Sequence, residues 1–314
     1  MQYDLIIIGG GPAGSAAAVY AARKQLKALL IAYEFGGQSI VSDDIQNWIG
    51  TVSISGKELA KNLKAHVEAY ADDILTIQQG ENVTSIEKDP SSEVEGEGFI
   101  VKTDSDSTFS TKTVLISSGS GRRKLDVKGA EEFENKGITY CATCDGPLFS
   151  GQDVIVIGGG NAGMESAAQL LAYTKSVTLL HRGDEYRADK ITVDKVLSNP
   201  KMTGILNAQT IEVKGDSFAK SLVYKDTNTG EEHELQATGV FVEIGQIPNT
   251  SFIGDVAELD NYKRIKIDTR NQKTSQPGIW SAGDCSDVLY HQNNIAAGDA
   301  VRAIEDIFVT LHTK

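Results

Sequence analysis

One local pattern occurs twice in this chain of 314 residues. In each copy, a short run of β-branched and apolar residues leads into Gly-x-Gly-x-x-Gly, and an alanine-rich stretch follows. The copies occupy residues 3–23 and 153–173. A buried parallel strand, a tight turn and a helix have these compositions. The repeat therefore predicts an α/β fold with two units of the kind that bind dinucleotides.

The glycines in this pattern have a physical role. They let the backbone turn tightly and approach a pyrophosphate, which then lies on the N-terminus of the following helix. A lone glycine motif is weak evidence, but here a strand and a helix flank both copies. The candidate contacts are Gly9, Gly11, Pro12, Ala13 and Gly14 in the first copy, and Gly158, Gly160, Asn161, Ala162 and Gly163 in the second.

The residues after the second strand of such a unit choose the nucleotide, because a carboxylate there binds a ribose and an arginine binds a 2′-phosphate. In the first unit we expect that strand at residues 26–32, so that Glu34 comes slightly late. In the second unit, the strand at 176–180 is followed by His181, Arg182 and, further on, Arg187, with no carboxylate directly at its end. This favours NADPH, and NADH remains the alternative.

Between the two copies lies Cys141-Ala142-Thr143-Cys144-Asp145. This spacing is typical of a dithiol/disulfide couple or of half a metal site. A zinc site needs further Cys or His ligands nearby, and the sequence offers few. We therefore expect a redox pair and no metal. Cys285, the third cysteine, is expected to be a small buried packing residue.

The remaining segments complete a nested organisation. We expect a helix at 55–70, antiparallel strands at 80–88, 99–103 and 108–110, an acidic loop at 90–98 and a strand at 113–118. Strands at 239–244 and 278–284 and a helix at 294–311 follow. The predicted fold has two Rossmann-like three-layer nucleotide-binding domains with the second inserted into the first. The predicted domains are 1–118 with 245–314, and 119–244.

Composition excludes several classes of protein. The net charge is −13, and an acidic surface opposes binding to nucleic acid phosphates. With three cysteines the chain is not a secreted disulfide scaffold. The N-terminus lacks the basic region of a signal peptide, and no apolar run approaches the roughly 18 residues of a membrane span. We expect a soluble cytoplasmic protein.

Taken together, these features resemble the low-molecular-weight thioredoxin reductase family over the whole chain. The most specific stretches are Cys141-Ala142-Thr143-Cys144-Asp145-Gly146, Gly36-Gly37-Gln38, Asn47-Trp48, Ala282-Gly283-Asp284 and Tyr290-His291-Gln292. The chain is also similar to the flavoprotein subunit of alkyl hydroperoxide reductase, which carries an additional N-terminal dithiol region. By resemblance, the acceptor disulfide belongs to a separate thioredoxin or thioredoxin-like protein, and the chain forms a homodimer.

The resemblance also implies the site. FAD binds the first unit, with further contacts from Gly37, Gln38, Asn47, Val83, Gly283, Asp284, His291, Gln292 and Asn293. The nicotinamide nucleotide binds the second unit. Cys144 faces the flavin, Cys141 attacks the partner disulfide and Asp145 transfers the proton. Domain rotation has its hinges near 119–123 and 243–245.

Two departures from the family pattern leave cofactor choice open. NADPH-specific members usually have a second arginine where this chain has Gly183, and tend to have alanine at Gly163. Three alternatives to an NADPH-dependent thioredoxin reductase therefore stay open: an NADH-dependent reductase of a peroxiredoxin system, a ferredoxin-dependent reductase, and a redox-sensing flavoprotein that does not turn over.

Overall fold

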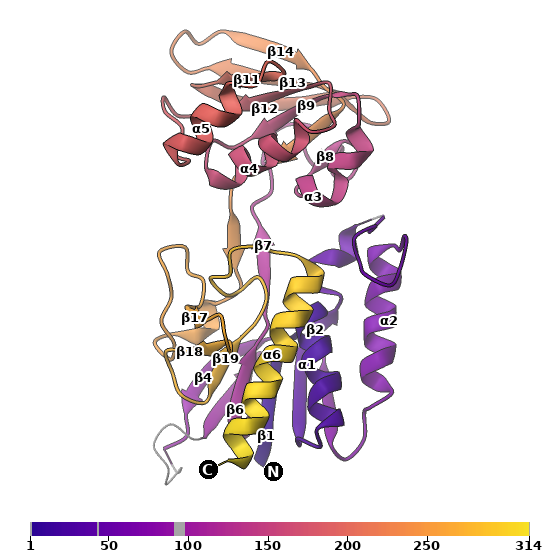
Figure 1. Cartoon of the computed structure of the whole chain (residues 1–314), viewed down its shortest axis with the longest axis vertical. Coiled ribbons are helices and arrows are strands. Elements are labelled where there is room, and N and C mark those ends of the chain that lie inside the picture. Colours follow the sequence, from indigo (N-terminus) through magenta and orange to yellow (C-terminus); the bar gives the residue numbers. More distant parts are fainter. Residues whose placement is uncertain (1, 43, 91–97, 314) are drawn as a thin grey trace. The chain divides into compact units, whose positions relative to one another are not determined.

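The computed structural model describes residues 2–42, 44–90 and 98–313. The chain divides into two compact units. Unit 1 comprises Met1–Gly121 and Ile247–Lys314, and unit 2 comprises Arg122–Gln246. Unit 2 is thus inserted in the chain of unit 1 (Figure 1). Most of the acidic loop predicted at 90–98 lies outside the described residues.

Unit 1 is built on one mixed sheet. Its strands are β1 (Gln2–Gly10), β2 (Ala28–Phe35), β3 (Leu75–Gln79), β4 (Val83–Lys88), β5 (Phe99–Thr103), β6 (Thr108–Ile116), β17 (Ile267–Asp268), β18 (Lys273–Thr274) and β19 (Ile279–Ser281). The order is β17-β18-β19-β6-β1-β2-β3, and β5 joins β4 to β6 in antiparallel pairing. Its helices are α1 (Pro12–Arg23), α2 (Gly56–Glu68) and α6 (Asn293–His312), with 3-10 turns η1 (Gly37–Val41) and η3 (Ser251–Ile253).

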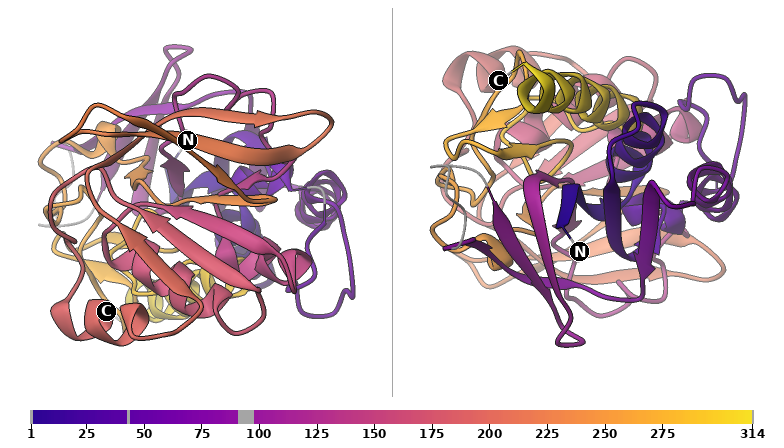
Figure 2. Two further views of the ribbon diagram at one scale, coloured as in Figure 1. Left: turned by 90° about the horizontal axis from the view of Figure 1, so that it is seen from above. Right: turned by 90° about the horizontal axis from the view of Figure 1, so that it is seen from below.

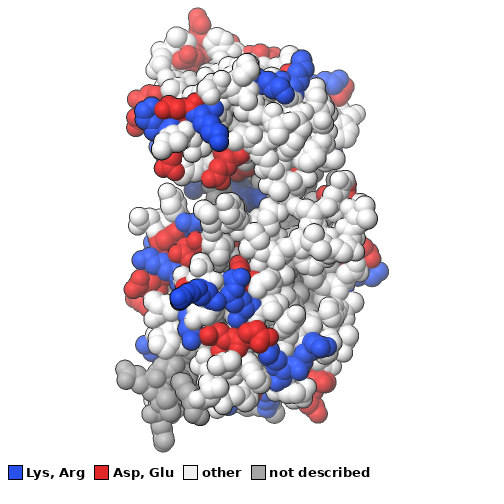
Figure 3. Space-filling model, viewed as in Figure 1, with Lys and Arg blue, Asp and Glu red and all other residues white. Residues whose placement is uncertain are grey.

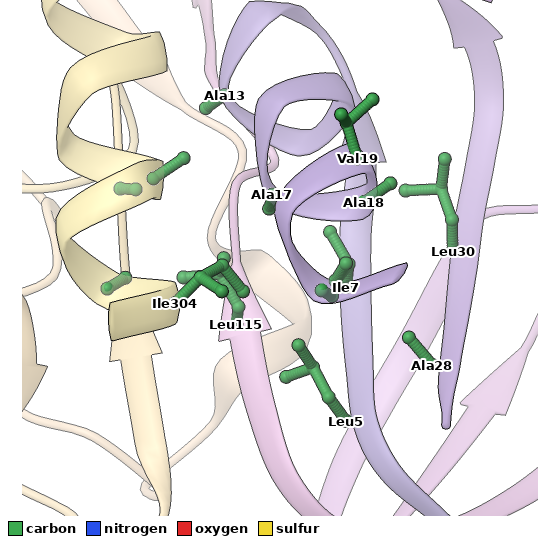
Figure 4. Packing of buried hydrophobic residues seen from close by; sticks show 14 of the residues in the cluster. Leu5, Ile7, Ala13, Ala17, Ala18, Val19, Ala28, Leu30, Leu115 and Ile304 are labelled. Atoms are coloured by element: carbon green, nitrogen blue, oxygen red, sulfur yellow. The ribbon is translucent and has the colours of Figure 1, made fainter. Parts of the chain in front are cut away.

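Helices α1 and α6 lie side by side on one face of this sheet (Figures 1 and 2). Leu5 and Ile7 of β1 and Leu115 of β6 pack there against Ala17 of α1 and Ile304 of α6 (Figure 4). The small side chains of α1 allow this close packing. Burying each large aliphatic side chain contributes about 1.5–3 kcal/mol.

The opposite face of the sheet is also covered. Side chains of β1 that alternate with Leu5 and Ile7 pack there against β4, β5 and the segment around Ile265. A strand whose successive side chains are all buried must be covered on both faces, which is what the near-continuous apolar run of β1 predicts. Unit 1 therefore has three layers: the helices, the parallel strands, and the antiparallel part of the same sheet, which packs over the other face of the parallel strands.

Unit 2 repeats this architecture. Its parallel strands are β8 (Ile138–Thr139), β9 (Asp153–Ile157), β10 (Ser176–Leu180), β11 (Met202–Ile205) and β15 (Gly239–Val242), in the order β11-β10-β9-β15-β8. One face carries α3 (Ala142–Asp145), α4 (Asn161–Leu170), α5 (Lys190–Leu197) and the 3-10 turn η2 (Gly146–Phe149). The other face carries the antiparallel strands β12 (Ala208–Gly215), β13 (Ala219–Asp226) and β14 (Glu232–Gln236).

The strand order of unit 2 reverses at its centre. The chain passes from β9 through α4 to β10 on one side, whereas β15 and β8 lie on the other side of β9. In open parallel sheets, ligands bind at the carboxyl ends of the strands at such a point. The carboxyl ends of β9 and β15 are therefore the expected nucleotide crevice.

Several predicted boundaries are wrong. Strand β2 continues past residue 32 to Phe35, with Gly10 of β1 paired to Phe35 after a register shift. The two strands predicted at 108–110 and 113–118 are one strand, β6, whose polar Thr111 is buried and donates its hydroxyl hydrogen bond to backbone carbonyls. Strand β3 was not predicted. Helix α4 occupies 161–170 instead of 164–173.

The side of the molecule shown in Figure 3 carries charges of both signs. Basic and acidic side chains are interspersed there within each unit. Ion pairs such as Lys112–Asp4 in unit 1 and Lys175–Asp153 in unit 2 join charges of opposite sign within each unit. Among the described residues, no helix combines the length and apolar character that crossing a membrane requires.

Candidate functional site

The first Gly-rich turn forms an open cradle in unit 1. Gly9 has a φ of +109°, and a Cβ on Gly14 would lie 1.7 Å from the Gly9 carbonyl oxygen, so both positions require glycine. At Gly11, by contrast, a Cβ would meet nothing nearer than Gly37 Cα at 3.9 Å. Gly11 is also the N-cap of α1 and offers no side chain to its free N–H groups. The residues present fit a phosphate bound at this helix end.

Three further predicted residues meet near the start of α6. The amide of Asn47 donates to Gln292 Oε1 at 3.1 Å, and Ser39 Oγ donates to Asn293 Oδ1 at 2.9 Å. Gln292 is the N-cap of α6 and makes no capping bond with its side chain. These two hydrogen bonds connect the segments that follow β2 to the N-terminus of α6. Gln38, in η1, donates instead to Ser120 Oγ at 3.3 Å.

The Gly-Asp turn after β19 joins the two helix ends. Gly283 has a φ of +77°, and its Cβ would lie 3.5 Å from that of Ala13 in α1 and 3.2 Å from that of Ala296 in α6. Asp284 Oδ1 lies 3.4 Å from His291 Nδ1, a nitrogen that is buried without a hydrogen-bond partner in the described structure. Gly283, Asp284 and His291 therefore lie where α1 and α6 begin.

Val83 is placed differently. Its side chain is buried in the core cluster on the antiparallel side of the sheet, among residues such as Ile8 and Ile31. The structure does not bring it among the polar side chains gathered at the start of α6.

Glu34 is a residue that the sequence prediction misplaced. Because β2 extends to Phe35, Glu34 lies within the carboxyl end of that strand and is exposed. A Cβ on Gly10 would lie 2.5 Å from the Glu34 carbonyl oxygen, which puts this backbone against the Gly-rich turn. An acidic residue about 20 positions after the glycines is the usual ribose ligand. The spacing between the Gly-rich turn and Glu34 therefore indicated a ribose ligand. The strand was predicted to end too early because its last residues include exposed, polar side chains.

The second Gly-rich turn repeats the cradle in unit 2. Gly158 has a φ of +129°, and a Cβ on Gly163 would lie 1.8 Å from the Gly158 carbonyl oxygen. A Cβ on Gly160 would meet no atom within 4 Å. Gly160 caps α4 without a side-chain hydrogen bond, and Ala162 in its first turn is exposed. Asn161 accepts a hydrogen bond from the Asp189 backbone at 2.9 Å and so orders the following loop.

His181 fixes this turn from the end of β10. Its Nδ1 accepts the hydrogen bond of the Gly159 backbone N–H at 3.2 Å, whereas its Nε2 is buried without a partner among the described residues. Burial lowers the pKa of His181, and the nearby charges of Arg187 and Arg182 lower it further. The ring is therefore neutral at pH 7, as the accepted bond requires.

Two arginines flank this histidine. Arg182 and Arg187 are exposed, and neither forms a salt bridge within the described part of the chain. The backbone N–H of Arg187 donates to the Gly159 carbonyl at 2.8 Å, which ties its loop to the Gly-rich turn. Gly183 leaves little room, since its Cβ would lie 2.9 Å from His181 Nε2. The arrangement offers two cations after the carboxyl end of β10, beside the Gly-rich turn.

Cys141 and Cys144 form a disulfide at the start of α3, with a Cα–Cα distance of 5.3 Å. The Cys141 sulfur accepts a hydrogen bond from the Cys144 backbone N–H at 3.1 Å. Both cysteines and Asp145 are half-buried. The disulfide thus belongs to unit 2 and is accessible without being fully exposed.

Thr139, at the end of β8, links this carboxylate to the disulfide. Its hydroxyl donates to Asp145 Oδ2 and accepts from the backbone N–H of Cys141 at 3.3 Å. Asp145 is further held by its own backbone N–H, which donates to the Cys141 carbonyl at 3.0 Å. The sequence prediction did not identify Thr139.

Cys285 belongs to unit 1 and takes no part in the Cys141–Cys144 disulfide of unit 2. It is fully buried in the core of unit 1, and burial raises the pKa of its thiol. Its sulfur lies 3.4 Å from Ser281 Oγ. No group of three or more His, Cys, Asp or Glu side chains in the described structure could hold a metal ion.

These features define a class of protein: a two-unit α/β protein with a dinucleotide-type cradle in each unit and a Cys-x-x-Cys disulfide in the second. Residues 3–300 match the family model described as pyridine nucleotide-disulphide oxidoreductase, and the chain belongs to this family.

Individual relatives agree with this assignment. The chain is 39% identical over 302 residues to NADH dehydrogenase of Bacillus subtilis (strain 168), which is 96% of this chain and 57% of that protein. It is 40% identical over 306 residues to a subunit of alkyl hydroperoxide reductase of Staphylococcus aureus (strain NCTC 8325 / PS 47), 98% of this chain and 58% of that protein. The chain therefore spans less than two thirds of the length of these curated relatives.

A solved structure matches over the full length. Thioredoxin reductase from Streptococcus pyogenes MGAS5005 gives a TM-score of 0.90 at 34% identity, covering 100% of this chain and 99% of that one. The predicted resemblance to thioredoxin reductases and the predicted fold, with two Rossmann-like domains, are both confirmed.

Proposed function

We propose that this protein is a flavin-dependent disulfide reductase that transfers electrons from NADPH, through FAD and the Cys141–Cys144 disulfide, to a thioredoxin-like protein. The observation that carries the proposal is the half-buried Cys-x-x-Cys disulfide in a unit that also holds an open Gly-rich cradle. The cradle of unit 1, with Glu34, Asp284 and the start of α6, would hold FAD. The cradle of unit 2 would hold the nicotinamide nucleotide.

The bound cofactors would supply a hydride from the nicotinamide and two electrons from the flavin to the disulfide. The protein's own residues handle the sulfur chemistry. Only a thiolate attacks a disulfide, so one reduced cysteine must lose its proton, and the leaving thiolate must gain one. The Cys141 thiolate attacks the partner disulfide, forms a mixed disulfide and releases one partner thiolate. Cys144 then attacks the Cys141 sulfur, which closes the internal disulfide and releases the second partner thiolate, and Asp145 transfers the proton. Thr139 orients Asp145.

A second candidate partner has a specific observation in its favour. The 40% identity to a component of alkyl hydroperoxide reductase favours a peroxiredoxin system. In addition, Gly183 occupies the position at which NADPH-specific members of the family usually have a second arginine. In that case NADH would be the donor and a separate dithiol domain the acceptor. Homodimerisation remains an expectation from the resemblance, and a cytoplasmic location remains an expectation from the sequence.

Turnover tests the proposal directly. The protein loaded with FAD is mixed with NADPH or NADH and with oxidised thioredoxin or an oxidised peroxiredoxin-linked dithiol domain. Reduction of many equivalents of disulfide per protein is the expected result. Cys141→Ser should keep nicotinamide-driven flavin reduction and lose disulfide reduction. A protein that stalls after one turnover with every partner would not be a reductase.

A further inference from the structure

A carboxylate that the proposed chemistry does not use lies beside the nucleotide crevice of unit 2. Glu243 directly follows β15, and its backbone N–H donates to the Ile157 carbonyl at 2.8 Å. A Cβ on Gly158 would lie 2.1 Å from the Glu243 carbonyl oxygen. Glu243 is therefore the immediate neighbour of the Gly-rich turn, at the point where the strand order reverses.

Its side chain is held in a fixed position. Ser166 of α4, a buried residue, donates its hydroxyl hydrogen bond to Glu243 Oε1 at 2.7 Å. Within the described structure this is the side chain that hydrogen-bonds the carboxylate. Glu243 as a whole is half-buried, so the group is partly removed from water while one oxygen is already bound. The second oxygen, Oε2, remains an acceptor for a donor in the crevice.

The surroundings of the Glu243 carboxylate disfavour its charged form unless a further hydrogen-bond donor is present. Burial raises the pKa of Glu243, and Glu165 raises it further, whereas the Ser166 hydrogen bond and the charge of Arg122 lower it. A half-desolvated carboxylate with one hydrogen-bonded oxygen gains from a further donor. Its position suggests a ligand as the source of that donor.

The side of the crevice on which Glu243 lies indicates which part of a bound dinucleotide it would contact. A dinucleotide crosses the reversal point with its pyrophosphate on the Gly-rich turn. His181 and Arg182 follow β10, so the adenosine half lies on the β10 side of β9. Strand β15 pairs with β9 on the other side. The nicotinamide nucleoside must extend over that side, where Glu243 is found.

We propose that Glu243 is a binding residue for the nicotinamide nucleoside, whose ribose hydroxyls or carboxamide NH₂ donate a hydrogen bond to its carboxylate. This inference rests on the proposed function, because it requires that unit 2 binds a nicotinamide dinucleotide. Ser166 acts as a positioning residue that holds the carboxylate towards the crevice.

Binding of nucleotide fragments tests the assignment without reference to turnover. Isothermal titration of the FAD-loaded protein uses ADP, ADP-ribose and NAD⁺, with the 2′-phosphorylated forms in parallel. Glu243→Gln should leave ADP affinity unchanged within about twofold and weaken NAD⁺ about tenfold, as expected when a neutral hydrogen bond replaces a charge-assisted one. If ADP-ribose is weakened equally, the donor is a ribose hydroxyl. If only NAD⁺ is weakened, it is the carboxamide.

Two further variants separate binding from a structural role. Ser166→Ala should reproduce the same pattern with a smaller loss, because the carboxylate remains but is no longer held. Asp153→Asn, at the opposite end of the neighbouring strand and paired with Lys175, is the matched carboxyl-to-amide control and should bind every ligand as the wild type does. Melting temperatures of all variants are compared to confirm folding.

The outcomes are distinguishable. Equal loss for ADP, ADP-ribose and NAD⁺ in Glu243→Gln would mean that Glu243 only shapes the Gly-rich turn, and the inference would be wrong. Unchanged affinity for all three would also overturn it. If the wild-type protein itself binds no nicotinamide nucleotide, the proposed function fails, and the inference fails with it.

Discussion

The hydroxyl of Thr139 connects the carboxylate of Asp145 to the backbone of Cys141, donating to the first and accepting from the second at 3.3 Å. Thr139 is buried at the end of β8, so this bridge is shielded from competing water. A carboxylate that must transfer a proton to a nearby thiolate has to be held within hydrogen-bond reach of it. Thr139 therefore sets both the position and the environment of Asp145.

Thr139→Val should slow disulfide reduction by about 10- to 100-fold, the range for losing a hydrogen bond to a charged group. Nicotinamide-driven flavin reduction should be unaffected. Stopped-flow measurement of both half-reactions checks this. Thr139→Ser keeps the donor and should retain most of the activity, which a purely steric role for the methyl group would not give.

Glu34 should contribute to FAD binding in unit 1. It lies at the carboxyl end of β2 against the Gly-rich turn and is exposed, so it is free to accept from a ribose hydroxyl. Glu34→Gln should weaken FAD about tenfold or more, measured by titrating apoprotein with FAD and following flavin fluorescence. Glu68→Gln, an exposed glutamate near the end of α2, is the matched control and should bind FAD normally. Equal affinity in Glu34→Gln would remove this residue from the site.

The positions of the buried parallel strands could be predicted because buried strands have a high content of apolar residues. The ends of β9 and β10 agree with the prediction, since each strand finishes in apolar residues directly before polar or glycine residues. The end of β2 was missed because Tyr33 and Glu34 are exposed although they continue the strand. Apolar composition indicates which residues of a strand are buried. The backbone hydrogen bonds of the strand can continue beyond those buried residues.

The candidate site was predictable only in part for a related reason. Gly-rich turns and the Cys-x-x-Cys spacing are local, so they are visible in sequence. Thr139 and Glu243 acquire their roles from long-range packing: β8 meets α3, and β15 brings Glu243 to Ser166 of α4. A lone threonine or glutamate carries no local signal of such contacts. Such residues can be identified only when the order of the strands in the sheet is known.

The two glycines of the second turn should respond differently to the same substitution. A Cβ at position 160 meets no atom within 4 Å, whereas at position 163 it lies 1.8 Å from the Gly158 carbonyl oxygen. Gly160→Ala should therefore keep the melting temperature but weaken nucleotide binding, because the methyl group occupies the space of the pyrophosphate. Gly163→Ala should lower the melting temperature. Thermal denaturation and nucleotide titration together check this, and tight nucleotide binding by Gly160→Ala would contradict the cradle assignment.

Arg182 should distinguish NADPH from NADH. It is exposed beside His181 and has no salt-bridge partner within the described structure, so it is available to a 2′-phosphate. Arg182→Ala should weaken NADPH about 10- to 100-fold and NADH by less than about threefold, since only the former carries the phosphate. Dissociation constants for both nucleotides check this. Equal losses would show that Arg182 does not bind the 2′-phosphate.

Acid should destabilise the second nucleotide turn through His181. The pKa of this histidine is lowered from its usual 6.5, mainly by burial, so below pH 6.5 the unfolded chain binds a proton that the folded chain resists. The corresponding stability is present above pH 6.5 and is lost as pH falls from 6.5 through the lowered pKa of the folded state. Protonation of Nδ1 would also oppose the hydrogen bond from the Gly159 N–H.

The expected loss between pH 7.5 and pH 5.5 has an upper limit of about 1.4 kcal/mol, because one proton changes the free energy of unfolding by at most that amount per pH unit below 6.5. Urea denaturation at a series of pH values measures it. His181→Asn is the matched variant, because its side-chain oxygen can accept from the Gly159 N–H but does not titrate. This variant should be less dependent on pH over the same range, and an identical pH dependence would show that another group is responsible.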